Sequence, residues 1–170
     1  MAFRADDDGR IAYLFTDLTP MMSFEKVPWY ETLAFNLPLL MISLLMFLSM
    51  LIVTFIRFLR RRRLVADQTP SPRRASRLIV GISILNLLFI VGNVMWGEQI
   101  VFGIPFAYKV TLGLGVLSAL LTVAALVYAV LAWKDRYWGV AYRVYYTLVT
   151  VAAVAFVWFL NQWNLLGWQY

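Results

Sequence analysis

The run Val110 to Trp133, VTLGLGVLSALLTVAALVYAVLAW, decides the fold of this chain. It carries no charge and is longer than the about 20 apolar residues that a helix needs to cross the hydrocarbon core of a bilayer. Small and hydroxylated residues recur along it in steps of four and three, and in lipid such residues let two helix backbones approach closely. The run therefore predicts the central helix of a membrane bundle, with a packing seam formed by Thr111, Gly115, Ser118, Thr122, Ala125, Ala129 and Ala132.

Three more apolar stretches of similar length flank this run. The four predicted helices cover about residues 37–57, 78–96, 110–133 and 144–160. Hydrophobic residues make up 62% of the chain, against roughly 45–50% in an average globular protein. None of the stretches has a polar face wide enough for contact with water, and helices satisfy their own backbone in lipid. We therefore predict an all-α membrane protein, a four-transmembrane-helix bundle, in preference to a soluble helical core.

The segments between the apolar stretches divide the positive charge unevenly. Residues 57–77, RFLRRRRLVADQTPSPRRASR, hold eight arginines against one acid, and residues 134–143, KDRYWGVAYR, hold three more basic residues. Lys and Arg collect on the cytoplasmic side of membrane proteins, and Trp and Tyr collect at the two interfaces. Both basic segments are therefore expected in the cytoplasm. The protein is expected in the bacterial inner (cell) membrane as a multi-pass protein, with its N-terminus and C-terminus outside.

The arginine run has two possible partners. Basic runs also occur in nucleic-acid-binding proteins, but this one directly follows a membrane helix, where each basic residue gains roughly 1 kcal/mol from anionic lipid. The lipid bilayer is the predicted partner and nucleic acid is not. The predicted lipid contacts are Arg60, Arg61, Arg62, Arg63, Arg73 and Arg74. Within the same segment, residues 69–76, TPSPRRAS, have the composition of a loop.

The first 32 residues differ in character from the rest. MAFRADDDGRIAYLF, residues 1–15, predicts a short β-hairpin with its turn at DDDG, and it lacks the apolar core of a signal peptide. Two isolated strands are marginal in water, so the hairpin is expected at the edge of a larger extracytoplasmic β-structure that something upstream delivers. The predicted domains are residues 1–32, the hairpin and pre-membrane segment, and residues 33–170, the transmembrane domain.

Ser23 and Lys26 form a Ser-x-x-Lys pair, the spacing that places nucleophile and activating lysine in β-lactamase-type enzymes. That chemistry needs the serine at a helix N-terminus and partner motifs of Ser-Asp-Asn and Lys-Thr-Gly type, which this sequence lacks. Pro28 also disfavours helical backbone at Val27. We therefore expect no catalytic residue, no enzyme activity in the chain itself, and Lys26 at the level of the lipid headgroups.

Cofactor and transport chemistry are also disfavoured. The chain contains neither cysteine nor histidine, which removes thiolate ligands, the commonest metal and haem ligand and the usual general base. No cofactor and no metal are expected. The predicted helices hold no ionisable residue at depth, so a small transporter or channel is disfavoured. Asn86 and Asn93, seven residues apart on one face, are expected to hydrogen-bond to a neighbouring helix.

FRADDDGRIAYLF, residues 3–15, and PMMSFEKVPWYET, residues 20–32, precede an apolar run that ends in a basic hairpin. This arrangement resembles the C-terminal membrane region of bacterial membrane-anchored serine hydrolases, the β-lactamase-related, penicillin-binding-protein-like family. The resemblance implies a catalytic domain that lies outside the membrane and upstream of the bundle, and this sequence does not include it. The positions that match the family pattern are Phe3, Asp6, Gly9, Phe24, Lys26, Trp29, Tyr30 and Thr32.

Two functions follow as expectations. The first is a non-catalytic integral membrane domain or subunit that anchors or accompanies an extracytoplasmic enzyme of serine-hydrolase type. The second is a small accessory or structural subunit of a larger multi-subunit membrane complex, whose partners are other membrane protein subunits. An upstream hydrolase in the same polypeptide or operon distinguishes the first from the second.

Overall fold

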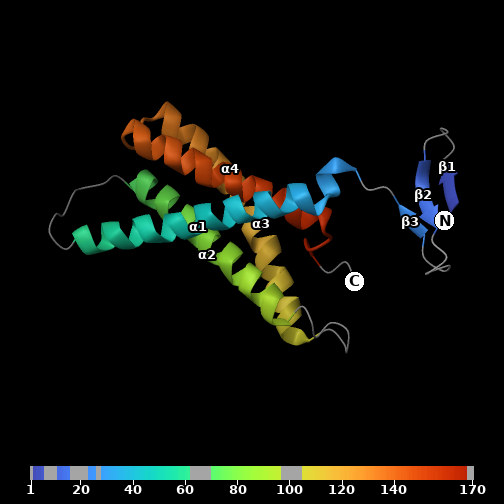
Figure 1. Ribbon diagram of the computed structural model, residues 1–170. Helices are drawn as coiled ribbons and strands as arrows, with labels where there is room; N and C mark the ends of the chain where they lie inside the picture. Colours follow the sequence, from blue (N-terminus) through green and yellow to red (C-terminus); the bar gives the residue numbers. More distant parts are fainter. Residues whose placement is uncertain are drawn as a thin grey trace. The chain divides into compact units, whose positions relative to one another are not determined.

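Four long α-helices form most of the computed structural model (Figure 1). The structure describes residues 2–5, 11–15, 23–25, 28–61, 70–96 and 105–167. The helices are α1 Leu33–Arg61, α2 Pro70–Trp96, α3 Phe106–Lys134 and α4 Val140–Gln162. Each is long and apolar enough to cross a membrane, which confirms the prediction of four potential membrane-spanning helices.

Two helices extend beyond their apolar stretches. Residues 70–76, which the composition assigned to a loop, are the first two turns of α2. Pro70 and Pro72 are tolerated there because the N–H groups of a first helical turn have no acceptor within the helix. Likewise α1 continues past its apolar residues to Arg61, since arginine is a good helix former. The loop prediction was wrong because proline and serine, which are typical of loops, are also typical of the first turn of a helix.

The chain forms two compact units, Met1–Leu37 and Pro38–Tyr170. The first unit contains a three-stranded antiparallel sheet of β1 Ala2–Ala5, β2 Ile11–Phe15 and β3 Ser23–Glu25, in the order β1-β2-β3. Leu14 in β2 pairs with Phe3 on one side and with Phe24 on the other. The sequence predicted only the first two of these strands, and the structure adds a third strand, which pairs with the open edge of β2. The predicted turn at residues 6–9 lies outside the described residues.

A short 3-10 turn, η1 Trp29–Glu31, leads into α1 within the first unit. The side-chain amide of Asn36 donates to the backbone oxygens of Tyr30 and Thr32, at 2.9 and 3.0 Å. The Trp29 ring meets the Phe35 ring edge to face at 5.0 Å between centroids. These contacts join the first turn of α1 to the preceding 3-10 turn.

In the second unit, antiparallel neighbours hold the bundle together. Asn86 of α2 lies beside Ser118 of α3, while Gly92, six residues later, lies beside Thr111, seven residues earlier. On α1, Ser43 contacts Ala152 and Ser49 contacts Tyr145, so α1 and α4 also run in opposite directions (Figure 1). The backbone of α3 lies close to those of both α2 and α4, and α1 joins the bundle through these side-chain contacts with α4.

Phe156 of α4 occupies the centre of this unit and is fully buried. Its ring makes edge-to-face contacts with Phe47 of α1 at 5.7 Å and with Phe89 of α2 at 6.0 Å between centroids. Phe89 in turn lies against Gly115 of α3, where an added Cβ would come within 3.0 Å of the ring. Edge-to-face aromatic pairs contribute about 0.5–1.5 kcal/mol each. In lipid such packing matters more than hydrophobic burial, which does not drive one helix onto another.

All seven residues of the predicted seam are buried in α3, together with Tyr108 and Leu112. The backbone approach is closest near one end of the seam, where a Cβ built on Gly92 would lie 2.5 Å from Oγ1 of Thr111. No side chain larger than hydrogen fits at Gly92 unless Thr111 moves. Small residues on α3 therefore meet a glycine and aromatic rings on the neighbouring helices.

Polar side chains in the helices are satisfied mostly within the bundle. Ser118 donates to Oδ1 of the buried Asn86 at 2.5 Å, which joins α3 to α2. Asn93, in contrast, donates to the Phe89 carbonyl of its own helix at 3.1 Å. The expectation of an interhelical hydrogen bond is therefore confirmed for Asn86 and wrong for Asn93. A local carbonyl one turn away is an acceptor that a helical polar side chain can reach without a partner helix.

Candidate functional site

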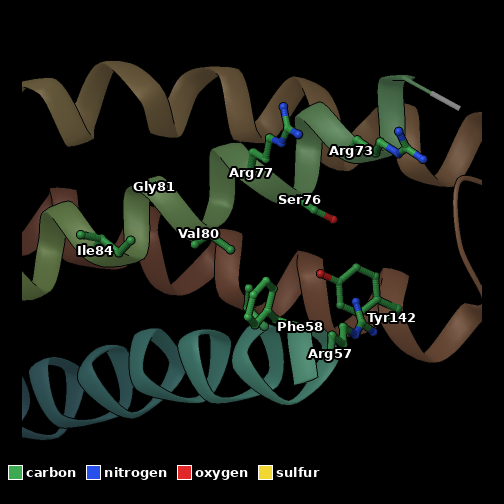
Figure 2. Close-up of a pocket in the computed structure, with 10 residues that line it drawn as sticks. Arg57, Phe58, Arg73, Ser76, Arg77, Val80, Gly81, Ile84 and Tyr142 are labelled. Atoms are coloured by element: carbon green, nitrogen blue, oxygen red, sulfur yellow. The ribbon is translucent and has the colours of Figure 1, made fainter. Parts of the chain in front are cut away.

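A groove of about 480 Å³ lies between α1, α2 and α4, at the end of the bundle where α2 begins (Figure 2). It combines three arginines and three hydroxyl groups with apolar side chains. The residues that line it are Thr54, Arg57 and Phe58 of α1, Arg73, Ser76, Arg77, Val80, Gly81 and Ile84 of α2, and Tyr142 of α4.

One face of α2 supplies most of the groove. Its lining residues follow the spacing of three and four that places side chains on a single side of a helix. Arg73, Ser76 and Arg77 come first, and Val80, Gly81 and Ile84 follow about one to two turns deeper. The groove is therefore polar and positive at one end and apolar along its length.

Arg57 and Tyr142 form the opposite wall. The guanidinium carbon of Arg57 lies 3.7 Å from the centre of the Tyr142 ring, a cation–π contact that holds the planar guanidinium group against the ring. In Figure 2 the hydroxyl groups of Tyr142 and Ser76 both face the space between α2 and α1. Stacking leaves the guanidinium edge available as a donor, which suits recognition of a phosphate or carboxylate.

The electrostatics of the groove are one-sided. None of the four helices contains Asp or Glu, so no helical carboxylate can neutralise Arg57, Arg73 or Arg77. All three arginine side chains are exposed. Positive charges with low-dielectric walls on one side concentrate anions. The described helices therefore place positive charge beside an apolar groove with no helical carboxylate to neutralise it.

The structure describes four of the six arginines that were predicted to contact lipid. Arg73 lines the groove, while Arg74 lies on α2 outside the groove lining. Arg60 and Arg61 belong to the last turn of α1, and Arg62 and Arg63 lie outside the described residues. The sequence reasoning missed Arg57, Arg77, Ser76 and Tyr142. Arg73 and Arg77 at spacing i, i+4 would have indicated a shared face, had residues 70–76 been recognised as helical.

An aromatic cluster surrounds the start of α4 beside the groove. Trp138 meets Tyr142 edge to face at 4.9 Å and packs on Tyr146 at 5.4 Å between ring centroids. Nearby, the guanidinium of Arg143 lies 5.2 Å from the Trp133 ring, whose Nε1 donates to Thr147 at 3.0 Å. The rings around Trp138 fix the position of Tyr142 and hence of its stacked arginine.

The structure describes only one residue of the Ser-x-x-Lys pair. Ser23 is the first residue of strand β3 and not the first residue of a helix, and Lys26 lies outside the described residues. Within the part of the chain that the structure describes, no group of three or more metal-ligating side chains comes together.

Four apolar helices, each long enough to cross a membrane, are typical of multi-pass helical membrane proteins, and the chain has the features of this class. Comparisons with protein-family models, with curated proteins and with solved structures find no match to this chain.

Proposed function

We propose that this chain is a non-catalytic membrane domain or subunit that anchors or accompanies an extracytoplasmic enzyme of serine-hydrolase type. It would lie in the bacterial cell membrane with both termini outside. The resemblance of residues 3–32 to the pre-membrane region of such enzymes suggests the enzyme class. The uneven distribution of arginine suggests the orientation.

The interior of the bundle is the observation that carries this proposal. Pumps and transporters need ionisable side chains at depth to move protons or ions, and the four helices contain no Asp, Glu or His. The centre is instead filled by Phe47, Phe89 and Phe156. A closed, uncharged and aromatic centre suits a domain that holds position in the membrane.

Purification from native membranes tests the proposal. The chromosomal protein is tagged at its C-terminus, extracted in mild detergent, labelled with a fluorescent fluorophosphonate, and analysed by intact mass. The expected result is a reactive serine hydrolase in the same polypeptide or in a stoichiometric partner. Recovery of a 19.6 kDa chain alone, or of a stable complex without a reactive hydrolase, would refute it; the latter result favours the accessory subunit.

The chain itself should not react with the same probe. Ser23 lies in a strand that pairs with β2, and the sequence supplies no partner motif to activate it. Purified chain and a Ser23→Ala variant should show the same background labelling by fluorophosphonate and by fluorescent penicillin. Labelling of the parent chain that disappears in Ser23→Ala would mean that it is an enzyme.

A further inference from the structure

We propose that the groove between α1, α2 and α4 is a binding site for one anionic phospholipid, with the phosphate at the arginines and an acyl chain along the apolar wall. The proposal rests on the membrane placement proposed above and names a specific lipid partner for it. In the proposed orientation the lipid would belong to the cytoplasmic leaflet.

The polar end has the donors that a phosphodiester needs. Arg57 offers a guanidinium edge while its face is held on Tyr142, and Arg73 and Arg77 line the groove from α2. In Figure 2 the two α2 guanidinium groups extend away from Ser76, but both are long side chains at the groove mouth and can rotate toward a bound anion. The hydroxyls of Ser76 and Tyr142 supply two uncharged donors.

The apolar end has the dimensions of a lipid chain segment. The lining residues of α2 run from Arg73 to Ile84, which spans roughly 16 Å along the helix axis at 1.5 Å per residue. Val80, Ile84 and Phe58 form the wall beyond the charges. Gly81 widens the groove, because a Cβ built there would meet no atom within 4 Å. A small soluble anion needs only the arginines and leaves this apolar length unused.

The charge of the site selects the headgroup. Phosphatidylcholine and phosphatidylglycerol both present a phosphate, but the choline cation would be repelled by three arginines that no helical carboxylate neutralises. The site therefore favours a lipid with net negative charge over a zwitterionic lipid with the same chains.

Lipid retention by the purified full chain tests the proposal. The chain in detergent is titrated with phosphatidylglycerol or with phosphatidylcholine of identical acyl chains, and bound lipid is counted by native mass spectrometry. We expect one phosphatidylglycerol to be retained in preference to phosphatidylcholine. Arg57→Gln and Arg77→Gln should each weaken this binding by about fivefold, which corresponds to roughly 1 kcal/mol per basic residue.

Two further variants separate the site from general surface charge and from a free anion. Arg74→Gln removes an equal charge from a neighbour outside the groove lining, and it should change binding by less than about twofold. Gly81→Leu keeps every arginine and fills the apolar wall, so it should weaken phosphatidylglycerol binding while leaving thermal stability intact. Inorganic phosphate at millimolar concentration should not displace the lipid.

Three results would overturn the proposal. Equal losses in Arg74→Gln and Arg77→Gln would mean a diffuse basic surface. Full lipid binding by Gly81→Leu, with displacement by phosphate, would mean a site for a free anion. Equal retention of the two lipids would mean no headgroup selection. Because these measurements use the chain alone, they can fail while the hydrolase partnership holds, and the reverse is also true.

Discussion

At the scale of single residues, Gly92 and Thr111 set how closely α2 and α3 approach. A Cβ on Gly92 would lie 2.5 Å from Oγ1 and 2.7 Å from Cγ2 of Thr111, both well inside van der Waals contact. Thr111 cannot turn freely away from this contact, because its hydroxyl donates to the Ala107 carbonyl at 3.1 Å. Gly92 and Thr111 therefore allow the backbones of α2 and α3 to come closer than a larger residue at position 92 would permit.

Gly92→Ala should therefore destabilise the bundle by about 1–3 kcal/mol, the usual cost of overpacking. Adding Thr111→Ala removes the two colliding atoms and should recover more than half of the loss, so the two substitutions should be non-additive. Gly81→Ala is the control, since the space around Gly81 is open. The measurement is thermal unfolding in detergent. Additive effects of Gly92→Ala and Thr111→Ala would show that the helices are not in contact here.

The sequence could predict the buried residues of the α3 seam, because their small size is visible in the sequence itself. Thr111, Gly115 and Ala125 stand out because small residues are conspicuous in an apolar run, and all three are buried. The contact between Arg57 and Tyr142 could not be foreseen. It depends on which helix lies beside α1, and neither residue's neighbours in the sequence contain that information.

At the scale of elements, the α3 seam is complementary to larger side chains at its centre. A Cβ added to Gly115 would lie 3.0 Å from the Phe89 ring and 3.4 Å from the Leu160 side chain. The number and approximate centres of the helices followed from hydropathy alone. The first turns of α2 did not, because Pro70 and Pro72 resemble loop residues unless their position at a helix start is known. The third strand was missed because Ser23–Glu25 is too short for a strand period to be visible.

Replacing Gly115 by leucine should disrupt the packing of α3 and leave its insertion unchanged. The new side chain would collide with the Phe89 ring, at a cost of about 1–3 kcal/mol, while leucine remains favourable for membrane insertion. Gly81→Leu makes the same change in α2, where an added Cβ meets no atom within 4 Å, and it should be neutral or slightly stabilising. Thermal stability and membrane fractionation measure the two effects. Equal unfolding temperatures for both variants would contradict the packing described for α3.

At the scale of the whole molecule, charge gathers at one end of the bundle. Near the end of α1, the start of α2 and the turn between α3 and α4, the described residues include nine cations and a single acid, Asp135. The cations are Arg57, Arg60, Arg61, Arg73, Arg74, Arg77, Lys134, Arg136 and Arg143. Moving this end across a membrane would cost about 2.3 kcal/mol per charge per 100 mV in addition to desolvation. One orientation should therefore dominate.

Cysteine labelling can read this orientation, because the chain has no cysteine of its own. Glu31, Asp135 and Asn164 are exposed positions before α1, after α3 and after α4. In spheroplasts, an impermeant maleimide should label Glu31→Cys and Asn164→Cys directly, and Asp135→Cys only after permeabilisation. Labelling of Asp135→Cys from outside, with protection of the other two, would invert the proposed topology.

The side-chain contacts between α1 and α4 also affect how the protein is assembled during synthesis. Ser43 and Ala152 are separated by 109 residues, and Ser49 and Tyr145 by 96. Of these four helices α1 leaves the ribosome first, so it waits on the order of ten seconds for its partner at ordinary rates of translation. During this interval the Ser49 hydroxyl is not left without a partner, because it can donate to the Met46 carbonyl of its own helix, at 2.8 Å. In the same interval α2 can pack against α3. A ribosome that stalls before α4 is made would therefore leave α2 and α3 packed together and α1 without its partner helix.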